Sequence, residues 1–300
     1  MATTTTISGS VISDYVNVHK DELLTKATLD ARTIQFLDIM PNVKYKDVIP
    51  TLDSEVTLQD GSQCGFNPTG SDSFGEKYIE TMALKSEKSW CWKDFEKTWA
   101  NYQLLWQAGR EVMPFEEKIA NHNLGLVQEE LEDIVWNGDS GLSFNGIIDL
   151  MTDASASTIN VSGVTSASSI TDAVDAVVEA MPMSALKKGV NVFLSYSNLR
   201  KFILARNAAC CFKDPEDAAQ DTFKYPGDSR VTLVAVNGIG ENYIVGAAKD
   251  AIVYATDVED ANAVYRMWFN EETEKFNWRV LFRAGIAFRY EDEVAYASLA

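Results

Sequence analysis

The chain has 300 residues, 46% of them hydrophobic and 11% aromatic, which is enough to bury a substantial core as one large domain or two. Its 26 basic and 44 acidic residues give a net charge of −18 at pH 7, which argues against a broad basic surface for nucleic acid. No apolar run reaches the roughly 20 residues of a membrane helix, and no secretory signal is expected at the threonine-rich start.

Residues 1–42 predict an N-terminal arm with a short helix near residues 20–31. Residues 43–92 predict a long extended hairpin, because two strand-like stretches flank a middle that is rich in turn residues. The hairpin has too little apolar content to pack alone, and an isolated two-stranded hairpin is marginally stable in water. We therefore expect it to lie on another surface, such as a neighbouring subunit.

Two helices are predicted next. Residues 93–108 carry aromatic side chains at helical spacing, and a longer helix runs from Pro114 to Trp136. The longer helix has a narrow apolar stripe, formed by Leu124, Val127, Leu131 and Ile134. Gly138 suits the left-handed conformation that ends a helix. This pattern is typical of a strut that buries one edge and leaves the other in water.

The region from about residue 165 to residue 254 alternates helix-like and strand-like segments, which predicts a compact mixed domain. Ser169 is placed to cap a helix that follows it. Strands are expected at residues 190–195, 231–236 and 243–246, and the glycine-rich stretch 237–242 is interpreted as a hairpin between the last two.

The C-terminal region is rich in strands. Alternating apolar residues at 264–269, 276–280 and 286–290, followed by residues 294–297, predict an antiparallel meander with one face in water. The whole chain is therefore expected to have an α+β fold.

Few residues suit catalysis. His19 and His122 are the only histidines, so a Ser-His-Asp or Cys-His enzyme would need one of them in a cleft. Gly238 and Gly240 lack the third glycine of a dinucleotide-binding loop, and no P-loop occurs. The four cysteines have no metal-ligand spacing and are expected to be reduced thiols; they are Cys64, Cys91, Cys210 and Cys211.

Acidic residues gather on the long helix, at Glu129, Glu130, Glu132 and Asp133. A divalent metal could bind such a cluster, but a solvated helix face is its usual meaning. We therefore predict no catalytic residue, no cofactor and no metal site.

The order of the segments resembles the major capsid proteins of tailed bacteriophages, with the Hong Kong 97 type of capsid fold. Four motifs carry the resemblance over most of residues 30–300. They are LEDIVWNGD (131–139) followed by FNGI (144–147), MPMSALKKGVNVFLS (181–195), YIVGAAKDAIVY (243–254) and WRVLFRAGIAFRY (278–290).

The resemblance implies a division of the chain into five parts. Residues 1–42 would be the N-terminal arm, and residues 43–92 the extended loop. Residues 93–155 would hold a helix and the spine helix of a peripheral domain. Residues 156–258 would form an axial domain, and residues 259–300 would return as strands of the peripheral domain.

The resemblance also implies self-assembly into hexamers and pentamers that close an icosahedral head around DNA. The candidate assembly contacts are Val56, Leu58, Phe66, Tyr78, Ile79 and Trp136. Other implied partners are a separate scaffolding protein, a portal protein, decoration proteins and packaged DNA, the last by non-specific contact. The protein would be made in the host bacterial cytoplasm and end in the virion capsid, with no membrane involved.

Three other classes compete with this interpretation. An encapsulin-like bacterial compartment shares the fold and encloses cargo enzymes instead of DNA. A metal-dependent hydrolase would use the acidic cluster, but the scarcity of histidines weighs against it. A phage tail or decoration protein is disfavoured by the strut and axial-domain motifs.

Overall fold

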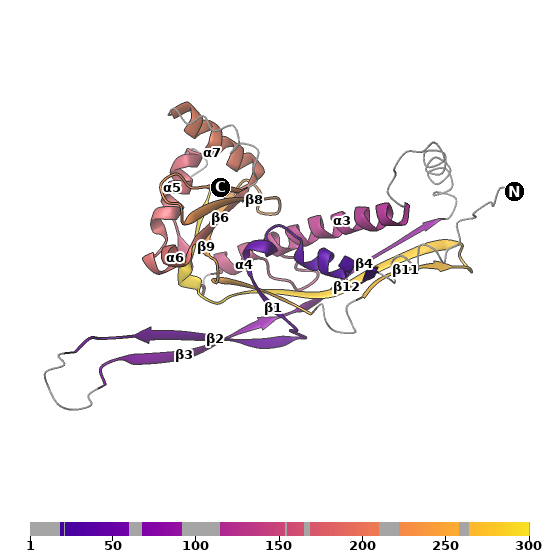
Figure 1. The fold of residues 1–300 in the computed structure, drawn as a ribbon, viewed down its shortest axis with the longest axis horizontal. Helices are drawn as coiled ribbons and strands as arrows, with labels where there is room; N and C mark the ends of the chain where they lie inside the picture. The colour runs from indigo at the N-terminus through magenta and orange to yellow at the C-terminus, as the bar shows by residue number, and fades with distance from the viewer. Residues whose placement is uncertain are drawn as a thin grey trace.

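In the computed structural model, the residues described are 19–20, 22–59, 68–91, 115–153, 155–164, 169–209, 222–257 and 264–299. They form two sheets and a projecting hairpin, connected by helices (Figure 1). The predicted helix at residues 93–108 lies outside the described residues. Among the helices in the described ranges, none is both long enough and apolar enough to cross a membrane.

The long strut helix is present as α3, Phe115–Asn137. All four residues of its predicted apolar stripe are buried. Gly138 has a φ of 69°, and its amide donates to the Ile134 carbonyl at 2.8 Å, so the helix ends there as predicted. The short helix α4, Ile147–Thr152, follows after a tight turn.

The five-stranded sheet is built around β12, Lys275–Phe288, which is one continuous strand rather than the two that were expected. It pairs antiparallel with β4 (Met82–Cys91), β11 (Val264–Asn270) and β10 (Ile252–Thr256), and β10 pairs with β1 (Asp38–Pro41). The alternation predicted around Phe276, Trp278 and Val280 is confirmed, since these side chains are buried. Helix α3 lies over this face, where the Tyr265 hydroxyl donates to the Ala120 carbonyl at 3.2 Å (Figure 1).

The six-stranded sheet has the order β5-β13-β9-β6-β8-β7. Its strands are β5 (Ile159–Asn160), β6 (Val190–Ser195), β7 (Thr222–Lys224), β8 (Val231–Val236), β9 (Tyr243–Ala248) and β13 (Val294–Ser298). Three helices pack with it: α5 (Ile170–Ala180), α6 (Met183–Lys188) and α7 (Tyr196–Ala209). Ser169 caps α5 as predicted, its hydroxyl accepting from the Thr171 amide.

The predicted hairpin at residues 237–242 is wrong. Strand β6 lies between β8 and β9, parallel to the first and antiparallel to the second. Every residue of β6 is buried, and a strand inside a sheet needs a partner on each edge. The two flanking strands therefore pair with β6 instead of with each other.

Sheet membership differs from the expected division of the chain at three strands. Strand β4 belongs to the five-stranded sheet, so the projecting hairpin is limited to β2 (Lys46–Glu55) and β3 (Ser71–Glu80). Strand β10 joins the five-stranded sheet, although it falls within residues 156–258. Strand β13 joins the six-stranded sheet, although it falls within residues 259–300.

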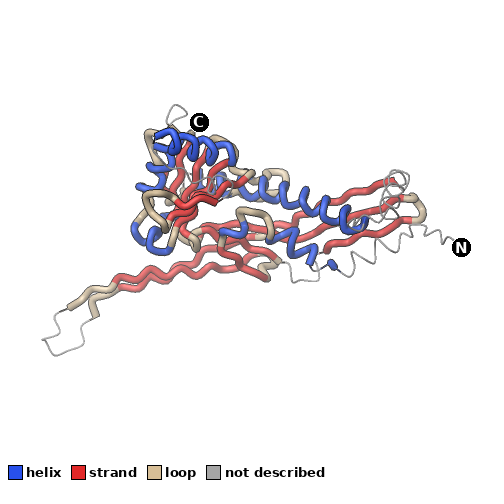
Figure 2. Tube along the Cα trace, turned by 45° about the horizontal axis from the view of Figure 1, so that its top comes forward, coloured by secondary structure: helices blue, strands red, loops and turns tan. Residues whose placement is uncertain are grey.

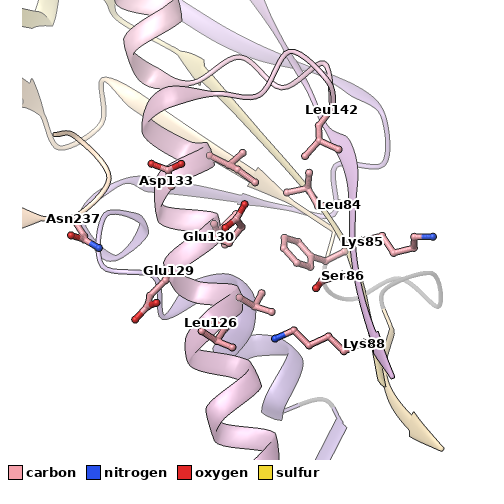
Figure 3. Close-up of a pocket in the computed structure, with 14 residues that line it drawn as sticks. Leu84, Lys85, Ser86, Lys88, Leu126, Glu129, Glu130, Asp133, Leu142 and Asn237 are labelled. Atoms are coloured by element: carbon pink, nitrogen blue, oxygen red, sulfur yellow. The ribbon is translucent and has the colours of Figure 1, made fainter. Parts of the chain in front are cut away.

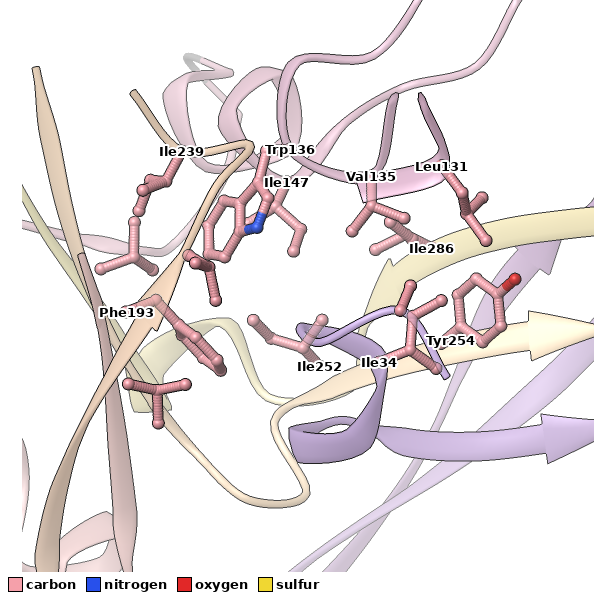
Figure 4. Close-up of a cluster of buried hydrophobic side chains, with 14 of the residues drawn as sticks. Ile34, Leu131, Val135, Trp136, Ile147, Phe193, Ile239, Ile252, Tyr254 and Ile286 are labelled. Carbon is pink, nitrogen blue, oxygen red and sulfur yellow. The ribbon is translucent and has the colours of Figure 1, made fainter. Parts of the chain in front are cut away.

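A buried cluster links the end of α3 to both sheets (Figure 4). Trp136 is completely buried and packs edge-on against Phe193 of β6, with ring centroids 5.4 Å apart. Its indole nitrogen donates to the Thr33 hydroxyl at 2.7 Å. Burial of so large an aromatic side chain makes this contact a main anchor between the two sheets.

Candidate assembly surface

The β2–β3 hairpin projects from the rest of the chain, away from both sheets (Figures 1 and 2). Its strands pair in one unbroken antiparallel register, from Lys46 opposite Glu80 to Glu55 opposite Ser71. Among the described residues, the hairpin packs against other elements at its root. There Ile49 and Ile79 are buried in a small apolar cluster with Val43, Val253, Ala255 and Ala287.

Polar contacts fix the direction of the root. The Thr81 amide donates to the Tyr45 carbonyl at 2.8 Å, and the Lys77 ammonium lies 2.7 Å from a Glu291 carboxylate oxygen. The Ser157 amide donates to the other oxygen at 3.0 Å. Burial opposes ionisation of Glu291, but the Lys77 contact and the Ser157 amide leave the pKa of Glu291 below its usual range. The glutamate is therefore ionised at neutral pH and holds the hairpin to the body.

A close approach between two backbone segments, at Gly285 of β12, also fixes the direction of the hairpin root. A Cβ atom at this position would collide with the carbonyl of Glu80, at the end of β3. Glycine is required here because the end of β3 crosses directly over β12.

One face of the hairpin carries several exposed apolar side chains. Residues paired across an antiparallel ladder point to the same side, so Leu52 and Phe74 share this face with Val48 and Tyr78, and the pair Pro50 and Glu76 lies between them. The exposed fractions are 53% for Leu52, 80% for Phe74 and 54% for Tyr78. Beyond β2, Val56 and Leu58 are exposed as well. Single exposed apolar residues are common on proteins, but a contiguous group of them marks an interaction site.

The predicted contact residues fall into three groups. Val56, Leu58 and Tyr78 are exposed on the hairpin, while Phe66 lies outside the described residues. Ile79 and Trp136 are completely buried, so they are corrected to core residues: a side chain with no exposed surface has none to offer a neighbour. Sequence reasoning missed Phe74 because only the strand register pairs it with Leu52.

A groove separates α3 from β4 (Figure 3). Its volume is about 630 Å³, and its floor is apolar, formed by Leu84, Val127, Leu131, Ile134 and Phe282. Lys88 points into the groove from the β4 side, whereas the Lys85 side chain points away from it (Figure 3). Glu129, Glu130 and Asp133 line the α3 side. Charges of opposite sign on the two walls favour no single small anion or cation.

The predicted acidic cluster on α3 does not lie on one exposed face, because Glu132 is buried. Glu132 points inward and is only 5% exposed, where it accepts from the Thr33 amide at 3.1 Å and from the Thr33 hydroxyl. Burial raises the pKa of Glu132, although both Thr33 hydrogen bonds oppose the shift. Glu132 therefore joins the N-terminal segment to the strut and is not part of an exposed metal site.

Within the described ranges, no three His, Cys, Asp or Glu side chains are close enough to hold a metal ion. His19 lies 3.5 Å from Glu22 at the start of the chain's first described helix, and neither histidine lines the groove. Cys91 is a free thiol at the end of β4.

No protein-family model matches the chain, and no curated protein matches it by sequence. Solved structures do match over nearly the whole chain. The satellite phage P4 procapsid, which includes the size determination protein, gives a TM-score of 0.60 at 10% identity, covering 96% of both chains. Mycobacterium phage Ogopogo gives 0.59 at 12% identity, covering 89% of this chain and 91% of the other.

A virus-like particle from Pyrococcus furiosus is also similar, with a TM-score of 0.52 at 10% identity. The match covers 92% of this chain and 96% of the other. The predicted α+β capsid fold is confirmed: the chain has the fold of phage capsid subunits.

Proposed function

We propose that this chain is the major capsid protein of a tailed bacteriophage and assembles into the hexamers and pentamers of an icosahedral head. One observation carries the proposal: a capsid-type fold presents a projecting hairpin with exposed apolar side chains that no described residue of its own subunit covers. A second copy of the chain is the natural cover, since closed symmetric assemblies bury the same surface on every subunit.

The physical basis is the burial of apolar surface between copies. Fully burying one large apolar side chain contributes roughly 1.5–3 kcal/mol. Leu52, Phe74 and Tyr78 each have more than half of their surface available for such burial. A ring of subunits repeats the contact at every interface, so a modest contribution per hairpin stabilises the whole shell.

The root contacts direct the hairpin toward its neighbour. Ile49 and Ile79 lock it to the body, and the ionised Lys77–Glu291 pair fixes the angle at which it leaves. A hairpin that is held at its root loses less conformational freedom on binding than a free loop would.

The proposed role is structural and not catalytic. The acidic chain would form a wall against which packaged DNA lies without tight binding, because phosphate contacts need a surplus of basic residues. The similarity to a virus-like particle supports a closed shell without identifying what it holds. A bacterial compartment with enzyme cargo is therefore the second candidate.

Electron microscopy of the purified chain, with light scattering, tests the proposal. We expect closed shells, rings or tubes in the megadalton range, formed alone or after addition of a scaffolding protein encoded beside the chain. The content of the shells distinguishes the two candidate functions, since DNA supports a phage head and co-purifying enzymes support a bacterial compartment. A monomer under all of these conditions would overturn the proposal.

A hairpin deletion tests whether the hairpin is the part of the chain responsible for assembly. Replacing residues 51–75 by a short glycine-containing turn keeps Ile49, Lys77 and Ile79 in place at the root. The shortened subunit is expected to stay folded, with unchanged circular dichroism, and to lose assembly. Normal shells from this variant would remove the hairpin from the mechanism.

A further inference from the structure

The groove between α3 and β4 has an open strand edge as one of its walls. In the described part of the chain, β4 pairs with β12 alone, so its second edge has no partner strand. Lys85 of β4 lines the groove although its side chain points away, so its main chain borders the space (Figure 3). An unpaired strand edge presents N–H and C=O groups that an added strand can bind.

Exposed leucines lie at the two ends of this groove (Figure 3). Leu126 of α3 is 40% exposed, and Leu142, in the turn after α3, is 43% exposed. Buried apolar side chains, among them Val127, Leu131 and Phe282, form the floor. A bound segment with an apolar side chain at each end would therefore remove apolar surface from water at both leucines.

The middle of the groove is acidic. Glu130 points from α3 toward β4, between the two leucines (Figure 3). Glu129 and Asp133 add two carboxylates on the same wall. Among the described residues, neither Glu129 nor Glu130 has an ion-pair partner. Lys88 points in near one end only, where its ammonium donates to the Asn123 side-chain oxygen at 3.4 Å, so the middle is complementary to a basic side chain.

We propose that the α3–β4 groove receives an extended tail of a partner protein, which adds to the free edge of β4 as a strand. A five-residue stretch of the tail would carry an apolar residue at each end and a lysine or arginine in the middle. The apolar ends would cover Leu126 and Leu142, and the basic residue would pair with Glu130. This inference goes beyond the proposed function and does not require the chain to assemble.

The two walls of the groove fit a stretch of this length. Leu84 to Lys88 spans about 14 Å along β4, at roughly 3.4 Å per residue. Leu126 to Ile134 spans about 12 Å along α3, at roughly 1.5 Å per residue. In an extended segment the first, third and fifth side chains point to the same side, so one face of five residues reaches both leucines and the acid between them.

Other occupants fit the groove less well. A helix would leave the main-chain groups of the β4 edge without partners, because only a strand can pair with them. The N-terminal residues 1–18 of a second copy contain neither lysine nor arginine, and they bring the acid Asp14 toward an acidic wall. A nucleic acid would place its phosphates against the same carboxylates. Charge therefore favours a basic and apolar tail from a different protein.

A short synthetic peptide tests the proposal on the full-length chain. The probe is the fluorescein-labelled peptide Ser-Leu-Thr-Arg-Thr-Leu-Ser, and its binding is measured by fluorescence anisotropy. One control peptide has glutamate in place of arginine. A second has the same composition but adjacent leucines, in the order Ser-Leu-Leu-Arg-Thr-Thr-Ser. The protein variants are Glu130→Lys and Leu126→Ser, with Glu179→Lys, an exposed acid of α5, as the control for charge.

We expect the parent chain to bind the probe about tenfold or more tightly than either control peptide. Glu130→Lys should weaken binding of the probe by a similar factor and should bind the glutamate peptide better than the probe, because the charges are then exchanged. Leu126→Ser should weaken binding of both. Glu179→Lys should bind the probe as the parent does. Circular dichroism verifies that each variant is folded.

Backbone methylation tests strand addition separately. One methylated probe carries N-methyl groups on its second, fourth and sixth amides, and another carries them on its third, fifth and seventh. Alternate amides of an added strand face its partner, so one methylated probe should lose binding and the other should keep it. Equal binding of the two methylated probes would exclude an added strand and overturn the proposal.

The outcomes separate this inference from the proposed function. A parent chain that does not bind the probe at millimolar concentration overturns the inference, whether or not the chain forms shells. Unchanged binding by Glu130→Lys also overturns it. A synthetic peptide of residues 1–18 that displaces the probe at equal concentration would assign the groove to the N-terminal segment of a second copy instead. Binding as expected by a chain that never assembles would leave this inference standing and the proposed function overturned.

Discussion

Replacing Leu52 and Phe74 by serine removes the centre of the hairpin's apolar face. Both side chains are largely in solvent in the isolated subunit, with 53% and 80% of their surfaces exposed. Scaling roughly 1.5–3 kcal/mol for full burial by these fractions gives a loss of about 2–4 kcal/mol per hairpin contact. A loss of that size corresponds to an association about 30 to 700 times weaker at each interface.

The assay is the assembly threshold, followed by light scattering over a concentration series and checked by electron microscopy. The folded subunit should keep its melting temperature within a few degrees, because the cross-strand pair contributes only about 0.2–1 kcal/mol to the hairpin. A matched control changes the opposite face of the same strands, with Thr51→Ser and Ser73→Ala. We expect the control to assemble like the parent.

One result would refute the reasoning. If the double serine variant assembled at the parent's threshold, the exposed apolar face would contribute nothing to contacts between copies. A rise in threshold for the control alone would place the contact on the other face of the hairpin.

Four further predictions concern the folded subunit. Ile79→Ala, in the buried root of the hairpin, should lower the free energy of unfolding in urea by about 2–5 kcal/mol; no loss would place the root elsewhere. Glu132→Gln should change the pH dependence of stability. Burial raises the pKa of Glu132 above 4.5, so the parent's stability relative to the variant should fall as pH rises from 4.5 through the folded-state pKa, and a constant difference from pH 4 to 8 would contradict this. Gly138→Ala should lower the melting temperature, because φ is 69° and a Cβ would lie 2.6 Å from the Gly146 nitrogen. Gly125→Ala, in the same helix with open space around it, should raise the melting temperature instead.

Local patterns predicted individual elements well. The apolar stripe from Leu124 to Ile134 predicted helix α3, and Gly138 predicted where the helix ends. The alternation around Trp278 gave the buried face of β12. Such signals survive in the sequence because helix and strand periodicities depend on neighbouring residues alone. The motifs and their order were sufficient to predict the capsid fold, which the structural matches confirm.

Pairing between distant segments was not predictable in the same way. The sequence shows strands at residues 231–236 and 243–246 without showing that β6 lies between β8 and β9. It shows an apolar Ile79 without showing that the root of the hairpin is where it is buried. Likewise, Glu132 looks like one more acid on a solvated helix until Thr33, 99 residues away, is placed beside it.

The sequence by itself determined the elements, the net negative charge and an extended hairpin with too little apolar content to pack alone. Only the tertiary structure decided which of its side chains remain exposed, because exposure depends on where the root meets the body. The tertiary structure also placed Lys85 of β4 on one face with Arg266 and Arg279, which come from the distant consecutive strands β11 and β12. Strand register, a long-range property, sets which charged side chains become neighbours.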